Sequence, residues 1–96
     1  MSFGDKVAKA ENEIKQAVDD LANEGAYDVD DYDGFKFHGS FLENGTPGPN
    51  PVFTFYFKHD KFRAVQTVAE IEKRCPQAKA DGIRFELRFE DPALAD

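Results

Sequence analysis

Three short segments of this chain carry a large apolar side chain, most often phenylalanine, at nearly every second position. The segments are residues 35–41 (FKFHGSF), 53–58 (FTFYFK) and 83–90 (IRFELRFE), and their apolar residues fall at odd-numbered positions. Successive side chains of a β-strand point to opposite faces, so the alternation predicts three strands that each bury one face. With ten phenylalanines and no tryptophan in 96 residues, we expect residues 1–96 to form a single domain around a phenylalanine core.

The first two predicted strands are joined by a turn-rich segment, residues 43–51 (ENGTPGPNP), and therefore read as a hairpin. Pairing Phe41 with Phe53 and Phe37 with Phe57 keeps every phenylalanine on one face, which is the condition that sets the register. The connection is longer than the two to five residues usual for a hairpin. A loop of that length is a candidate for insertion into a partner's groove.

Residues 5–23 are predicted to form an amphipathic helix, because their apolar positions recur at helical spacing. These positions are Val7, Ala10, Ile14, Ala17, Val18 and Leu21. Gly25 follows at the point where a left-handed residue commonly ends a helix. The acids at the end of this helix lie at its negative pole, where cations are preferred, and therefore carry a small local cost. That cost suggests that the negative surface serves a purpose.

Residues 61–74 are predicted to form a second helix, with Asp60 as its N-cap and Pro76 ending it. The expected buried stripe is Ala64, Val65, Val68, Ile71 and Cys75. Residues 77–82 are expected to be a connector to the third strand.

The predicted order is α-β-β-α-β, a two-layer α+β fold in which both helices pack on the Phe-rich face of a three-stranded sheet. The second strand has the more apolar outer face, with Val52, Thr54 and Tyr56, which favours it as the central strand. The third strand is parallel to the second if the two are neighbours. If it lies beside the first strand instead, the sheet is wholly antiparallel.

Charge is unevenly distributed along the chain. Residues 1–34 hold ten acidic and three basic side chains, residues 35–96 hold nine of each, and the total is −7. Such a negative end repels nucleic acid and acidic lipid and attracts basic protein surfaces. The expected partner-binding residues are the acids at the end of the first helix and in the loop after it: Asp19, Asp20, Glu24, Asp28, Asp30, Asp31 and Asp33.

These features predict a small acidic inhibitor or interaction protein that blocks a basic, nucleic-acid-binding surface of a partner. In size and charge alone the chain is similar to nuclease-immunity proteins and to phage-encoded inhibitors such as anti-CRISPR proteins. No family motif accompanies that similarity. We expect no enzyme activity, no cofactor, no direct binding of nucleic acid and no membrane partner.

The aspartate-rich loop resembles a calcium-binding loop, because carboxylates alternate along it. If Gly34 is taken as the sixth position of such a loop, Val29 falls on the first ligand position and Ser40 on the twelfth. Both required carboxylates are therefore missing. The loop is read as a solvated turn or as part of the acidic partner surface, and a metal-binding accessory role remains the third alternative.

The outer face of the sheet supports an alternative function, as an adaptor that binds RNA or a peptide. Its candidate residues are Lys36, His38, Tyr56, Lys58, Arg84 and Arg88. Basic groups with an interleaved aromatic ring on an open sheet suit single-stranded bases. The competing interpretation is structural, because exposed strands commonly carry charge and Glu86 and Glu90 can pair with the arginines.

No run of about 18 apolar residues and no apolar leader occurs in the sequence, and Cys75 is the single cysteine. A cytoplasmic location is therefore expected. Cys75 is predicted to fill the core. The two histidines and the acids form no recognisable catalytic set, so we expect no catalytic residue.

Overall fold

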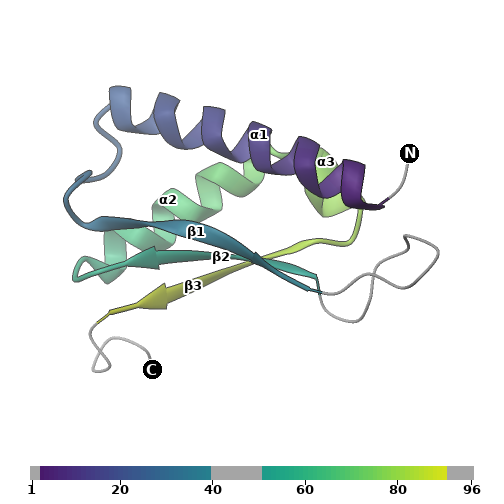
Figure 1. Ribbon diagram of the computed structural model, residues 1–96. Coiled ribbons are helices and arrows are strands. Elements are labelled where there is room, and N and C mark those ends of the chain that lie inside the picture. Colours follow the sequence, from purple (N-terminus) through teal and green to yellow (C-terminus); the bar gives the residue numbers. More distant parts are fainter. Residues whose placement is uncertain (1–2, 40–50, 91–96) are drawn as a thin grey trace.

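The computed structural model describes residues 3–39 and 51–90. Its elements are α1 (Phe3–Asn23), β1 (Tyr32–His38), β2 (Val52–Phe57), α2 (Lys61–Arg74), α3 (Pro76–Ala80) and β3 (Arg84–Phe89). Figure 1 shows α1 and α2 lying together on one side of the sheet. The predicted α+β fold is confirmed, and α3 is an addition to it.

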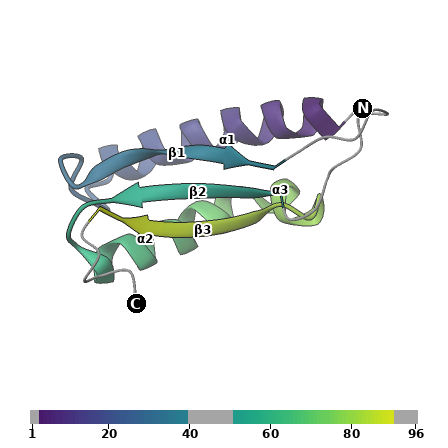
Figure 2. The same ribbon diagram turned by 60° about the horizontal axis from the view of Figure 1, so that its bottom comes forward.

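The sheet is mixed and has the order β1-β2-β3. β1 is antiparallel to β2, whereas β3 is parallel to it. Figure 2 shows β2 between the other two strands. α2 and α3 provide the crossover that a parallel pair of neighbouring strands requires. The expectation of a central second strand is confirmed, and the choice left open for the third strand falls to the parallel arrangement.

The register between β1 and β2 differs from the predicted one. Phe35 lies opposite Phe55, and Phe37 lies opposite Phe53 rather than Phe57. The predicted pairing was therefore wrong by four residues. Because four is an even number, both registers place the same rings on the same face, and a pattern of period two cannot distinguish them.

An irregularity at the start of β1 accompanies this register. The strand begins at Tyr32, which lies opposite Phe57, and the pairing shifts between Tyr32 and Phe35. Gly34 lies within the shift and has a φ of 96°, which a residue with a side chain rarely adopts. Phe41, which was expected at the end of this strand, lies outside the described residues.

The core fills the space between the sheet and the two long helices. Its centre is built from Ile14 and Leu21 of α1, Phe53, Phe55 and Phe57 of β2, and Ala64 and Ile71 of α2. The rings of the edge strands are only partly buried and pack against this centre: Phe35, Phe37, Phe85 and Phe89. The Phe-rich face is therefore most deeply buried along β2, where rings have neighbours on both sides.

α2 matches the predicted bounds, and the carboxylate of its N-cap Asp60 accepts a hydrogen bond from the Arg63 backbone N–H at 3.0 Å. The predicted buried stripe was wrong at Val65, which is 51% exposed. Thr67 is buried instead, and its hydroxyl donates to the carbonyl of Arg63 at 2.7 Å. That bond satisfies the buried hydroxyl, so a polar residue occupies the core-facing position next to Val68.

Residues 76–80 form the short helix α3 rather than a connector. Pro76 is its first residue, a position where the missing N–H is not needed and the fixed φ suits a helix. The same proline follows the end of α2, so the predicted stop is confirmed and a second helix starts immediately. Ala78 is buried and seats α3 on the core.

Candidate functional site

The loop that carries most of the candidate acids follows α1, which is ended by a residue in the left-handed backbone conformation. Gly25 has a φ of 73°, and its N–H donates to the carbonyl of Ala22 at 3.1 Å. The N–H of Ala26 donates to the carbonyl of Leu21 at 2.9 Å. This pair of bonds is the Schellman arrangement, which satisfies the last carbonyls of α1 and reverses the chain toward the sheet.

Tyr27 anchors the loop to the core. Its ring is buried edge-on against Tyr32 and Phe57, and its hydroxyl donates to the carbonyl of Val18 at 3.2 Å. Burial, and then the nearby Asp19 carboxylate, raises the pKa of Tyr27. The same two influences, together with Tyr27 itself, raise the pKa of Tyr32. Asp19 is therefore close to the loop in space as well as in the chain.

Asp31 fastens the loop to the start of α2. One carboxylate oxygen accepts a hydrogen bond from the backbone N–H of His59 at 2.8 Å, and the other accepts from that of Asp60 at 3.1 Å. The Asp31 carbonyl accepts from the N–H of Lys58 at 2.9 Å. Asp31 was expected among the partner-binding residues, but its carboxylate is engaged in structural contacts.

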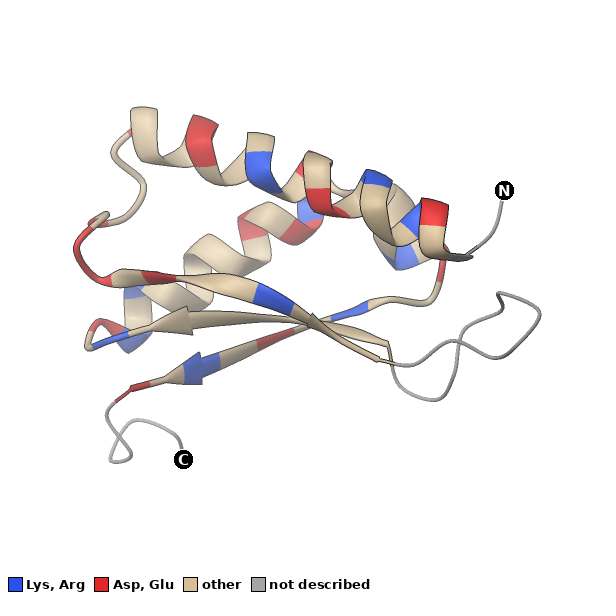
Figure 3. Cartoon of the chain, in the orientation of Figure 1, with Lys and Arg blue, Asp and Glu red and all other residues tan. Residues whose placement is uncertain are grey.

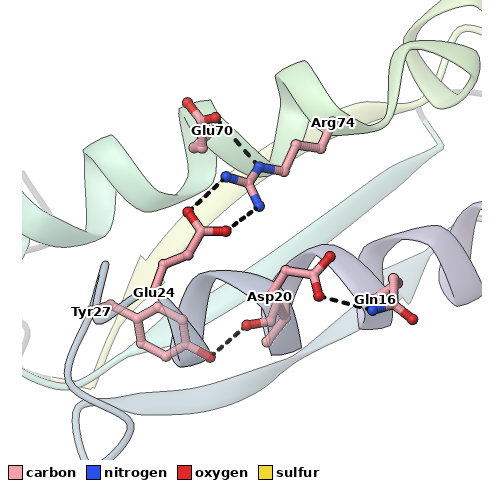
Figure 4. Close-up of polar contacts among 7 residues, drawn as sticks. Gln16, Asp20, Glu24, Tyr27, Glu70 and Arg74 are labelled. Carbon is pink, nitrogen blue, oxygen red and sulfur yellow. Dashed lines mark hydrogen bonds and ion pairs between the residues drawn. The ribbon is translucent and has the colours of Figure 1, made fainter.

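Glu24 is also engaged within the fold. Both of its oxygens accept hydrogen bonds from the Arg74 guanidinium, at 3.0 and 3.1 Å, and Glu70 contacts the same guanidinium at 3.4 Å (Figure 4). The Arg74 hydrogen bonds lower the pKa of Glu24. Asp20 accepts a hydrogen bond from the side chain of Gln16 at 2.9 Å. Because the Glu24 carboxylate is paired with Arg74, it offers little unpaired charge to a partner protein.

Within residues 3–39 and 51–90, six of the seven predicted acids make no ion pair, Glu24 being the exception, and four of the six are exposed. We call Asp19, Asp28, Asp30 and Asp33 the acidic surface, and all four are exposed. Asp28 accepts a hydrogen bond from the backbone N–H of Asp30 at 2.9 Å, which holds the turn. Figure 3 shows red along the connection between α1 and β1. The acids that gather there keep charge that the described part of the fold does not neutralise.

Several cations of the remaining elements form ion pairs with carboxylates outside the acidic surface. Arg63, Lys79 and Arg88 pair with carboxylates near them in the chain. The Arg88–Glu86 contact is the shortest of these, at 2.8 Å. The fold also brings Lys58, Lys61 and Arg63 to the end that bears the acidic surface. That end keeps a net negative charge, because its six aspartates outnumber these three cations: Asp19, Asp28, Asp30, Asp31, Asp33 and Asp60.

The outer face of the sheet carries a shallow depression of about 390 Å³. Its lining residues are His38, Val52, Thr54, Tyr56, Glu86 and Arg88. The His38 imidazole and the Tyr56 hydroxyl are 3.1 Å apart. The structure thus brings three of the six predicted outer-face residues into one depression.

The other predicted outer-face residues lie around that depression. Lys36 and Arg84 are exposed on β1 and β3, at alternating positions that share the outer face, and Lys58 follows the end of β2. Two of the groups that would contact a ligand already have protein partners. Arg88 pairs with Glu86, and the Thr54 hydroxyl donates to Glu86 at 3.4 Å.

A cleft of about 230 Å³ between α1 and α3 was not expected from the sequence. It is lined by Lys6, Lys9, Ala10, Glu13, Gln77, Ala78 and Asp81. The Lys6 ammonium lies 3.6 Å from the Asp81 carboxylate. Because α3 was predicted as a connector, no pattern in the sequence brought these two segments together, and the charges that line the cleft balance.

Three large hydrophobic side chains are exposed in the described part of the chain. Phe62 is 76% exposed, Val29 is 59% exposed and Val65 is 51% exposed. Phe62 and Val65 lie in α2, whereas Val29 lies between Asp28 and Asp30 of the acidic surface. Phe62 was not among the residues predicted to have a functional role. Its signal was present, because it does not fit the spacing of the buried stripe.

The cysteine and the possible metal ligands of the described residues do not gather into one site. Cys75 is buried as predicted, and burial followed by the Glu13 carboxylate raises the pKa of its thiol to about 11. No three His, Cys, Asp or Glu residues of the described segments are placed to hold a metal ion. None of helices α1–α3 has both the length and the apolar character needed to cross a membrane.

Comparison of the chain with models of protein families, with curated proteins and with solved structures finds no match. Function is therefore inferred from the geometry and charge of the chain itself.

Proposed function

We propose that this protein is a non-catalytic binding protein whose acidic surface occupies a basic, nucleic-acid-binding surface of a partner protein. The observation that carries the proposal is the set of exposed carboxylates on the acidic surface that have no cationic partner in the described residues. A role of this kind belongs with inhibitors such as nuclease-immunity and anti-CRISPR proteins.

The physical basis is electrostatic complementarity. Carboxylates spaced along a rigid surface can stand in for the phosphates of a nucleic acid, because arginine binds both in a two-pronged geometry. Complementary charge raises the association rate and makes binding fall as salt concentration rises. The Schellman turn at Gly25 and the contacts of Tyr27 and Asp31 support the proposal, because they hold the loop that bears these carboxylates.

The test is an affinity purification from lysate with and without nuclease treatment, at low and high salt. We expect a nucleic-acid-binding protein to be retained at low salt whether or not nuclease is present. The triple variant Asp19→Lys, Asp30→Lys and Asp33→Lys should lose that protein. The purified pair should then associate more slowly as salt rises.

A matched control variant carries the same change in charge away from the acidic surface, at Glu11→Lys, Glu13→Lys and Glu72→Lys. It should keep the partner. Equal loss in both triple variants would assign the effect to net charge alone, and retention by both would contradict the proposal. Circular dichroism of both variants checks that the fold is intact.

A second candidate is the binding of single-stranded RNA or a peptide across the outer sheet face. It is favoured by the depression that Tyr56, His38 and Arg88 line, on the side of the sheet opposite α1 and α2. A gel shift with single-stranded RNA that is lost in Lys58→Glu and Arg88→Glu would favour this candidate. The acidic-surface proposal predicts no shift at physiological salt, because phosphates would gain no release of counterions there.

A further inference from the structure

Two of the three exposed large apolar side chains share one face of α2. Phe62 and Val65 are three positions apart, a spacing that places side chains side by side on a helix. Together with Lys61 and Gln66 they line an open depression of about 430 Å³. Their exposure is not caused by a frayed helix end, because Asp60 caps the helix at Arg63.

This apolar face lies at the same end of the molecule as the acidic surface. Asp31 of the loop accepts hydrogen bonds from the N–H groups of His59 and Asp60, immediately before α2. Phe62 is in the first turn of that helix. Figures 1 and 2 both show the loop between α1 and β1 and the start of α2 at one end of the fold. Val29 adds an exposed apolar side chain within the loop itself.

The charge around this apolar face indicates what kind of partner would cover it. Lys61 lines the depression and Lys58 and Arg63 are near it, but the aspartates at this end of the fold outnumber these cations. A second copy of the chain, docked through the same face about a twofold axis, would therefore bring two ends of net negative charge toward each other. A basic partner meets no such repulsion. Stable interfaces commonly combine a central apolar or aromatic anchor with a charged rim.

We infer that Phe62 and Val65 form an apolar anchor beside the acidic surface. The partner would be a protein with an apolar pocket rimmed by arginine or lysine, rather than a uniformly basic surface. The inference rests on the proposed function and adds that charge alone does not account for recognition. A surface that only binds the phosphates of a nucleic acid needs no apolar pocket. The anchor would therefore favour partner proteins that have such a pocket over proteins that have only a phosphate-binding surface.

The test uses two synthetic peptides of equal length and charge. One is an amphipathic 14-residue peptide of arginine and leucine, and the other has serine in place of every leucine. We expect the arginine–leucine peptide to bind about tenfold more tightly by fluorescence anisotropy. Phe62→Ala should abolish that difference and leave the affinity for the arginine–serine peptide unchanged. Asn12→Ala, at an exposed position of α1 outside this depression, is the control and should change neither affinity.

The outcomes separate the two proposals. Equal affinity for the two peptides, or a Phe62→Ala variant that behaves like the wild type, would overturn the anchor and leave the charge-based proposal standing. If neither peptide binds, both proposals are wrong. If a glutamate–leucine peptide binds as tightly as the arginine–leucine peptide, the face does not select a basic partner and the inference is overturned. It is likewise overturned if sedimentation shows a dimer that Phe62→Ala converts to a monomer, because the face would then bind a second copy of the chain.

Discussion

Glu24 and Arg74, fifty residues apart in the chain, form a two-pronged ion pair that joins the end of α1 to the end of α2. A carboxylate at the C-terminal end of a helix is unfavourable with respect to the helix dipole, whereas an arginine there is favourable. The pair offsets the first effect with a direct contact, as Figure 4 shows. One acid of the charged end therefore has an architectural role, and reversing its charge would test folding as well as binding.

The pH dependence of stability should reveal this pair. Arg74 lowers the pKa of folded Glu24 below its ordinary value of 4.5, so the pair stabilises the protein fully above that pH. The contribution is lost as the pH falls through the lowered pKa. Thermal unfolding should show the wild type melting above Glu24→Gln near neutral pH, by a small margin because the pair is exposed.

That margin should close once the pH falls below the lowered pKa of Glu24, where neither protein carries the charge. Asp30→Asn serves as the control, because the Asp30 carboxylate makes no ion pair in the described residues. Its melting temperature should follow the wild type through neutral pH. A difference between wild type and Glu24→Gln that persists unchanged at low pH would argue against the ion pair as its cause.

Truncation of a buried phenylalanine should destabilise the protein far more than truncation of an exposed one. Phe55 is fully buried in the central strand, so Phe55→Ala should lower the free energy of unfolding by roughly 3–5 kcal/mol. Phe62→Ala, at an exposed position, should change it by no more than about 0.5 kcal/mol. Urea denaturation of both variants measures this, and a large loss at Phe62 would show that its ring is part of the core.

Removing the Asp31 carboxylate should loosen the junction between the loop and α2. Asp31→Ala leaves two exposed backbone N–H groups without their charged acceptor, and we expect a loss of about 0.5–1.5 kcal/mol in stability. Hydrogen exchange should accelerate at the amides of His59 and Asp60. Asp30→Ala, one residue earlier, should leave both amides protected. If the two variants exchange alike, the contacts of Asp31 do not hold the junction.

The Cys75 thiol should be unreactive in the folded protein. Burial raises its pKa to about 11 from an ordinary value of 9.0, so near pH 8 it is protonated as well as covered. A disulfide reagent should react slowly until urea unfolds the chain. The unfolded thiol loses its proton first as pH rises, so stability should fall between about pH 9 and 11, less so in Cys75→Ala. Rapid labelling of the native protein would contradict this prediction.

The sequence alone predicted the parts of the fold that depend on local pattern. Alternating phenylalanines identified the strands and their buried face, and the bounds of α2 followed from Asp60 before it and Pro76 after it. The expected end of α1 at Gly25 is likewise confirmed by its left-handed conformation. Such signals are readable because capping, turn geometry and side-chain period act over a few residues.

The cluster of acids was also visible in the sequence, but the sequence did not show which of them are bound within the fold and which stay free. Glu24 and Asp31 are bound by Arg74 and by the backbone before α2, partners that lie 50 and nearly 30 residues away. No local pattern distinguishes them from Asp30 or Asp33. Only the packing of α1, the loop and α2 decides which carboxylates stay free.

Tertiary structure likewise decided the pairing of Phe37 with Phe53 and the exposure of Val65. A strand pattern of period two permits every register that differs by an even number of residues, so the choice depends on where the two strands meet. On α2, Val65 and Thr67 both lie near the edge of the apolar stripe. The rotation of the helix against the sheet, set by close packing of Ala64, Val68 and Ile71, turned the valine to solvent and the threonine to the core.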